Sequence, residues 1–184
     1  MSYSLGDYVR DLRRITRTSA KDDDILQEVG PLAQRLVSDG SWLSDELYRS
    51  SEEQGFLAHL LHQEIDHSLA VFAVNWLPHR GAPPHDHGTW AIVVGVDGDE
   101  RNVRYRRIDD GKIPGYAQLE VKQEFNTGPG DLVCMQSGGI HSVHNDGDQM
   151  TLSLHTYGRH VNFTNRHQFD LATNTMSGFQ VDVA

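Results

Sequence analysis

The spacing of apolar residues divides the chain into a helical first third and a β-rich remainder. Over residues 5–15 the apolar positions recur at intervals of three and four, the period of an amphipathic helix. A second run covers residues 22–40, where three acidic residues at the start favour a helix N-terminus. Pro31 is expected to kink or divide this helix, and Gly40 to end it. We expect a further short helix over residues 42–48.

After Gly55 the apolar residues come in short runs that are rich in Val, Ile and aromatic residues and separated by Gly, Asp or Asn. The runs are FLAHLLHQ, HSLAVFAVNWL, WAIVVGV, NVRYRRI, AQLEVKQEF, DLVCMQ, HSVHN and MTLSLHTY. Many short strands at even spacing are typical of a barrel or two packed sheets. Beyond about Tyr157 we expect loops and a final strand over residues 178–183. The prediction is one structural domain, with a helical segment (residues 1–55) packed on a β-barrel (residues 56–184).

Composition excludes several classes of protein. The chain has 184 residues, 38% of them hydrophobic and 23% charged, which suits a globular domain. A net charge of −10 disfavours nucleic-acid partners, and the basic run RNVRYRR is interpreted as a solvated sheet face. No apolar stretch approaches the ~18 residues of a membrane helix, and the N-terminus lacks a signal-peptide core, so we expect a cytoplasmic protein. The single cysteine, Cys134, excludes an internal disulfide and a Cys-rich zinc site.

Eleven histidines are more than expected, and histidine is the commonest metal ligand. On a strand, residues i and i+2 face the same side, so His85 and His87 should project together with Asp86 facing away. Such a pair could hold one metal ion. Taken alone, it is also typical of ordinary surface or core histidines.

A second stretch, GDLVCMQSGGIHSVHN, resembles the second conserved motif of the cupin superfamily. The positions in register with that motif are Gly130, Gly138, His141 and Asn145, while Gln136 replaces a proline. The first cupin motif matches His85 and His87. Its usual glutamate is absent, because Ala91 and Ile92 stand near that place.

The absent glutamate leaves three neutral candidate ligands, His85, His87 and His141, instead of two histidines and one carboxylate. A metal in such a site keeps more of its positive charge and should accept an anionic ligand such as a thiolate. His144 is the alternative third ligand. Three histidines also accept Zn, Ni or Cu, so the sequence alone does not fix the metal.

The strand MTLSLHTY places Ser153, His155 and Tyr157 on one face. These residues could form a hydrogen-bonded relay in which Ser153 orients His155 and His155 tunes Tyr157, or they could line a polar edge strand. A hydrolase triad is disfavoured, since there is no nucleophile elbow and no nearby carboxylate in the sequence.

Between about Phe56 and Asp170 the chain resembles the cysteine dioxygenase family of cupin thiol dioxygenases. The resemblance rests on NWLPHRGAPPHDHGTW, the second cupin motif, SLHTYG and RHQFDLAT, in family order. It implies a cupin double-stranded β-helix, a jelly-roll barrel preceded by helices, which converts a thiol and O₂ to a sulfinate. It also implies Fe(II) held by His85, His87 and His141. Tyr157, tuned by His155 and Ser153, would hydrogen-bond substrate or oxygen.

The resemblance also bears on the substrate. No cysteine follows the HDH motif closely, so we expect no thioether on Tyr157. Arg166 stands where bacterial mercaptopropionate dioxygenases bind a carboxylate, and a guanidinium suits that task, although a surface salt bridge is the alternative role. Ala58 stands where the family carries Arg or Gln. We expect 3-mercaptopropionate as substrate, with L-cysteine or a bulkier thiol acid such as mercaptosuccinate as alternatives.

Two other classes of function remain open. One is a different metal-dependent cupin enzyme, and the other is a non-catalytic cupin that binds a sugar, a small molecule or a metal. The sequence gives no oligomeric state.

Overall fold

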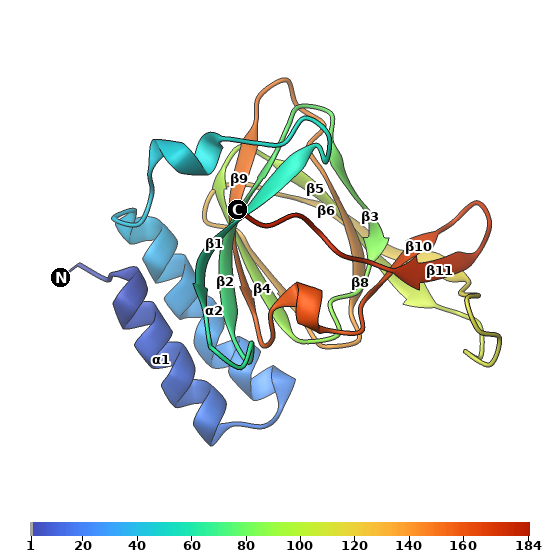
Figure 1. Cartoon of the computed structure of the whole chain (residues 1–184), viewed down its shortest axis with the longest axis horizontal. Helices are drawn as coiled ribbons and strands as arrows, with labels where there is room; N and C mark the ends of the chain where they lie inside the picture. The colour runs from blue at the N-terminus through green and yellow to red at the C-terminus, as the bar shows by residue number, and fades with distance from the viewer. Residues whose placement is uncertain (1) are drawn as a thin grey trace.

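Two antiparallel sheets form the β-rich part of the protein in the computed structural model, which describes residues 2–184 (Figure 1). The first sheet has the order β1 (Phe56–Gln63), β2 (Ala70–Trp76), β9 (Thr151–Tyr157), β4 (Ala91–Asp97) and β7 (Leu132–Met135). The second has the order β11 (Thr175–Gly178), β10 (His167–Asp170), β3 (Gly81–His85), β8 (Ile140–His144), β5 (Glu100–Arg107) and β6 (Leu119–Thr127).

The central strands of the first sheet are buried on both faces. Every residue of β2 and β9 is buried, which explains why these strands lack a clean alternation of apolar and polar residues. One face packs on the two N-terminal helices through residues such as Val71, Ile92 and Leu154. The other packs on the second sheet through residues such as Phe72, Val93 and Val143. The candidate site lies between the sheets.

The helices cover the outer face of the first sheet (Figure 1). Helix α1 (Leu5–Thr18) begins with a capping box between Ser4 and Asp7. Helix α2 (Asp22–Asp39) ends at Gly40, whose φ of 70° gives the expected left-handed cap. Helix α2 is not divided at Pro31, because buried residues on both sides of the proline pack against the same sheet.

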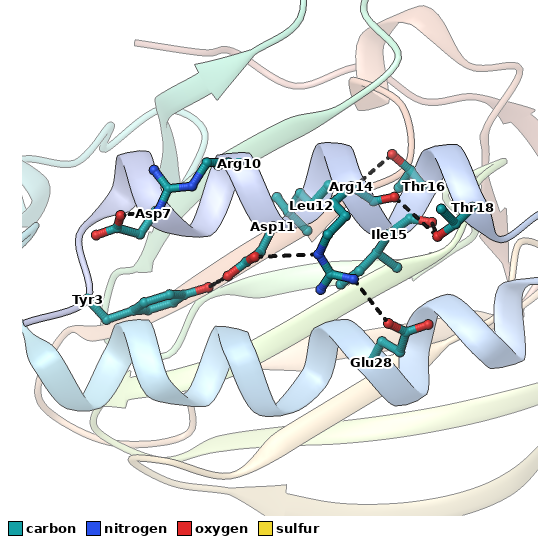
Figure 2. Close-up of polar contacts among 10 residues, drawn as sticks. All are labelled: Tyr3, Asp7, Arg10, Asp11, Leu12, Arg14, Ile15, Thr16, Thr18 and Glu28. Atoms are coloured by element: carbon teal, nitrogen blue, oxygen red, sulfur yellow. Dashed lines mark hydrogen bonds and ion pairs between the residues drawn. The ribbon is translucent and has the colours of Figure 1, made fainter. Parts of the chain in front are cut away.

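Polar contacts between the helices lie on the surface. Figure 2 shows Arg14 between Asp11 of its own helix and Glu28 of α2, with N–O distances of 3.8 and 3.9 Å. The Arg14 side chain is 60% exposed, so these ion pairs add little to stability. The apolar face of α1, which buries Tyr8 and Leu12, holds the helix in place.

The PPHDHG stretch passes from one sheet to the other. Strand β3 ends at His85, and β4 begins at Ala91 in the first sheet. The pairing of β3 with β8 is irregular between Ala82 and His85, where the two prolines donate no hydrogen bonds. The prediction that His85 and His87 share a strand is therefore wrong, since His87 lies in the connection.

The C-terminal region is more ordered than predicted. A 3₁₀ turn, η2 (Val161–Phe163), precedes the β10–β11 hairpin, which lies on the side of the barrel away from the helices (Figure 1). The final strand predicted over residues 178–183 is wrong, because β11 ends at Gly178. The segment that follows returns to β1, where the Ala184 N–H donates to the Ala58 carbonyl at 3.0 Å. The helix predicted over residues 42–48 is only the 3₁₀ turn η1 (Asp45–Tyr48).

Candidate metal centre

Three buried histidines converge between the sheets. His85, His87 and His141 are 5%, 2% and 2% exposed, and each offers a ring nitrogen within 4.8 Å of the others. His85 and His141 meet because they are register partners on β3 and β8. His87 reaches the same point from the β3–β4 connection. Three imidazoles at this spacing can hold one divalent metal ion.

The ring nitrogens are prepared for metal binding. His85 Nδ1 lies 2.8 Å from the Pro83 carbonyl, and His141 Nδ1 lies 3.4 Å from Asn102 Oδ1. Both partners accept, so each of these Nδ1 atoms carries the proton and leaves Nε2 free. His87 Nδ1 is buried and has no hydrogen-bond partner within residues 2–184, which is the kind of orphaned atom that a metal or ligand satisfies.

Burial also keeps these rings neutral. It lowers the pKa of His85 to about 4, helped by the positive charge of Arg166. Burial and the neighbouring histidines lower the pKa values of His87 and His141 well below the usual range. A neutral imidazole has a free lone pair, so the donor set fits a metal ion at neutral pH.

His144 does not join this cluster. It lies three residues after His141 on β8, and an odd spacing on a strand turns a side chain to the opposite face. Of the two histidines proposed as third ligand, the structure therefore places only His141 beside the pair. Cys134 is free and lies on β7, outside the cavity beside the histidines.

The histidines line a largely apolar cavity. Its apolar wall is formed by Phe56, Ala58, Phe72, Val74, Trp76, Ala82, Val143, Val161, Phe179 and Val181. Phe179 and Val181 belong to the C-terminal segment, which therefore closes one side of the cavity. Ala58 is buried in the wall, so a larger side chain at this position would reduce the space for a ligand.

Arg166 lines the same cavity and is 5% exposed. Its Nε donates to the Phe179 carbonyl at 3.0 Å, and its guanidinium lies 4.3 Å from the centre of the Phe179 ring. Burial lowers its pKa from the ordinary value, but a guanidinium stays charged. Nη2 has no hydrogen-bond partner, and no acidic side chain of residues 2–184 forms an ion pair with it. The surface salt bridge considered for Arg166 is therefore absent from the described structure.

Ser153, His155 and Tyr157 form a continuous buried chain on β9. Ser153 Oγ lies 2.9 Å from His155 Nε2, and His155 Nδ1 lies 2.8 Å from the Tyr157 hydroxyl. Burial lowers the pKa of His155 to about 3 and raises that of Tyr157 well above its usual range, so both groups are neutral. The Tyr157 ring centre is 5.1 Å from that of His87, which places the end of the chain beside the histidines.

Sequence reasoning missed one member of this chain. Glu100, the first residue of β5, is 4% exposed and accepts hydrogen bonds from Ser153 at 2.9 Å and Thr151 at 3.1 Å. Glu100 lies 53 residues before Ser153, so the lack of a carboxylate near Ser153 in the sequence did not exclude one in the fold. In the sequence Glu100 follows VDGD, a typical exposed turn, so only the alternation of β5 could have marked it as inward-facing.

No protein-family model matches the chain. Among solved structures, an uncharacterized conserved protein with a double-stranded β-helix domain from Klebsiella pneumoniae is 14% identical, with a TM-score of 0.50. That match covers 71% of this chain and 93% of the other. A cupin superfamily protein from Desulfitobacterium hafniense is 13% identical, with a TM-score of 0.43, over 61% of this chain and 84% of that one.

An oxalate oxidase in complex with the substrate analogue glycolate is 15% identical, with a TM-score of 0.47. The match covers 64% of this chain and 59% of the oxidase. Identities this low assign no activity to this chain. Separately, no helix within residues 2–184 has the length and apolar content to cross a bilayer. With its two antiparallel sheets and its likeness to the Klebsiella pneumoniae protein, the chain has the double-stranded β-helix fold that its sequence predicts.

Proposed function

We propose that the protein is a non-heme Fe(II) thiol dioxygenase that oxidises a small thiol carboxylate, with 3-mercaptopropionate as the favoured substrate. The observation that carries the proposal is that one apolar cavity holds both the three-histidine cluster and the buried guanidinium of Arg166, which forms no ion pair within residues 2–184. The first fits a metal that accepts a thiolate, and the second fits a carboxylate at the other end of a short ligand.

His85, His87 and His141 would hold the Fe(II). When bound, this ion would supply open positions for a thiolate and O₂ and a path for electrons between them. In the net reaction both atoms of O₂ become bonded to the substrate sulfur. The thiolate is oxidised to a sulfinate as O₂ is reduced, so no further reductant is needed.

Arg166 would bind the substrate carboxylate. A buried cation without a partner is costly, and a ligand carboxylate supplies the missing charge and acceptor atoms. The apolar wall contributes contacts to the short carbon chain and excludes water from the reacting atoms. Because Ala58 leaves room in that wall, L-cysteine and the bulkier mercaptosuccinate are the alternative substrates.

Tyr157 would act as the polar group that orients substrate or oxygen. Its hydroxyl stays protonated at neutral pH, and His155 behind it is neutral, so this pair can donate or accept a hydrogen bond without changing charge. Ser153 fixes the ring of His155 from the other side. In this proposal the residues of β9 position one O–H group beside the three histidines.

Oxygen uptake tests the proposal. The protein would be loaded anaerobically with Fe(II) and given 3-mercaptopropionate, L-cysteine, mercaptosuccinate or 1-propanethiol, which lacks the carboxylate. We expect uptake matched by sulfinate formation with a carboxylate thiol, much less with 1-propanethiol, and none after loading with Zn(II). No uptake with any thiol despite bound iron would overturn the proposal and favour another cupin enzyme. Failure to bind metal would favour a non-catalytic binding protein.

A further inference from the structure

The hydrogen-bonded chain behind Tyr157 begins at a carboxyl group on the other sheet. Glu100 on β5 contacts Ser153 on β9, Ser153 contacts His155, and His155 contacts Tyr157, with successive distances of 2.9, 2.9 and 2.8 Å. All four side chains are buried. Within residues 2–184 Glu100 forms no ion pair, so its hydrogen-bond partners are the two hydroxyls on β9.

The protons of this chain can be counted, because His155 is neutral and carries a single N–H. When Glu100 is ionised, it only accepts, so the Ser153 O–H must donate to it. His155 Nε2–H then donates to Ser153, and Nδ1 accepts the Tyr157 O–H. In this arrangement the tyrosine proton is directed away from the cavity.

When Glu100 is protonated, the donor and the acceptor of each hydrogen bond in the chain exchange roles. The carboxyl O–H donates to Ser153, the Ser153 O–H donates to His155 Nε2, and His155 Nδ1–H donates to the Tyr157 oxygen. The Tyr157 O–H is then free to donate into the cavity. Each heavy atom stays in place and each group keeps its number of bonds within the chain, so the observed distances suit both arrangements.

We propose that Glu100 is a positioning residue, whose protonation state sets the direction of hydrogen bonding through Ser153 and His155 and so decides whether Tyr157 donates to His155 or into the cavity. The effect on a thiol substrate rests on the function proposed above. The coupling between Glu100 and the His155 tautomer stands apart from it.

The surroundings of Glu100 place this change near neutral pH. Burial raises its pKa to about 7, against the lowering effect of the hydrogen bonds from Ser153 and Thr151. From β6, the Thr127 hydroxyl donates to the backbone carbonyl of Glu100 and not to its carboxyl group. From β9, the titratable groups that face it through Ser153 are His155 and Tyr157, and the negative charge of Glu100 contributes to the raised pKa of Tyr157.

Two charged neighbours of Glu100 in sequence are engaged elsewhere. Arg101 pairs with Asp146 and with Glu124, and Asp97 at the end of β4 accepts from Tyr48. No charged side chain among residues 2–184 forms an ion pair that would fix Glu100 in one protonation state.

The test is the tautomer of His155, followed by ¹⁵N NMR of histidine-labelled protein with and without added Zn(II). The His155 signals are assigned by their loss in His155→Gln. From about pH 9 to about pH 5, on either side of the Glu100 pKa, we expect the protonated nitrogen to change from Nε2 to Nδ1. In Glu100→Gln this change should disappear. The matched control is Glu124→Gln, an exposed carboxylate on the neighbouring strand, which should keep it.

A second variant keeps the test decisive if Glu100→Gln does not fold. Thr151→Val removes one hydrogen bond that lowers the Glu100 pKa, so the midpoint of the tautomer change should move to higher pH. A tautomer change that persists in Glu100→Gln, or an unmoved midpoint in Thr151→Val, would overturn the proposal. A tautomer change without oxygen uptake would leave this coupling standing and remove only the dioxygenase function.

Discussion

His85 and His141 lie directly opposite each other on β3 and β8, with ring centres 4.6 Å apart. The pairing of two strands therefore sets the spacing of two of the three candidate ligands, and the β3–β4 connection adds the third. Metal binding should depend on His141 but not on His144, which shares its strand and faces away.

We expect His141→Ala to abolish measurable iron binding, whereas His144→Ala binds as wild type. Loss of a ligand should weaken affinity by more than the roughly 10–100-fold that follows changes around a ligand. Metal content after anaerobic loading and desalting measures this directly. Equal iron content in the two variants would remove His141 from the site.

The convergence of the three histidines was predictable from sequence because the spacing of HDH and IHSVHN is specific, although His85 and His87 do not share a strand. Prolines at 83 and 84 interrupt the ladder, and His87 reaches the site from a connection rather than a strand. The alternation of Ser153, His155 and Tyr157 was sufficient to place them together, since β9 is a regular strand.

Glu100 and the C-terminal segment could not be predicted, because both depend on long-range contacts. Glu100 looks exposed in its local sequence and is buried only because β9 packs beside it. The segment after Gly178 has the sequence pattern of a strand but forms only one bridge to β1, and the support that Phe179 gives Arg166 is a tertiary contact. Local pattern identifies elements well and tertiary partners poorly.

Arg166→Ala should mainly raise KM for carboxylate thiols. Loss of a hydrogen bond to a charged group costs about 1.5–3 kcal/mol, which corresponds to about 10–100-fold in KM. Oxygen uptake with 1-propanethiol should change little, because that thiol has no carboxylate for the guanidinium to bind. The control Arg106→Ala removes an arginine that is 68% exposed, and it should leave KM unchanged. An unchanged KM in Arg166→Ala would remove this residue from the substrate site.

Arg166→Ala should lower the free energy of unfolding by less than the deep burial of the Arg166 side chain suggests. Its guanidinium has an unpartnered Nη2 and no ion pair within residues 2–184, so truncation removes a desolvated charge as well as the packing on Phe179. Urea unfolding of metal-free protein measures the difference. We expect a loss in the free energy of unfolding below the roughly 3–5 kcal/mol that is typical when one partner of a buried ion pair is removed. A loss of that size or larger would show that Arg166 has a charge partner in the native state.

Ala58→Leu should narrow the choice of thiol. The added carbons would occupy the cavity wall, so kcat/KM should fall more for mercaptosuccinate than for 3-mercaptopropionate. A difference of one or two methylene groups in an apolar pocket is worth about 10–200-fold in selectivity. Leu57→Met, at the neighbouring position that faces away from the cavity, is the control. An equal fall for both substrates would indicate general disruption.

Stability should also report the buried carboxyl of Glu100. Its pKa is about 7 in the folded protein and near the ordinary 4.5 when unfolded, so the folded state binds the proton more tightly. This contribution is fully present below the unfolded pKa and is lost as pH rises through the folded one. Between pH 4.5 and 7 the difference is worth up to about 3 kcal/mol.

Glu100→Gln removes this contribution while retaining the shape of the side chain. The buried histidines act in the opposite direction, because the low pKa of His85 makes the folded state weaker in acid. Both proteins contain these histidines, so their contribution cancels in the difference between the two free energies of unfolding. We expect the free energy of unfolding of the wild type, relative to Glu100→Gln, to rise as pH falls from about 7 to about 4.5, as measured by urea unfolding of metal-free protein. A constant difference across this range would mean that the pKa of Glu100 is the same in the folded and the unfolded protein.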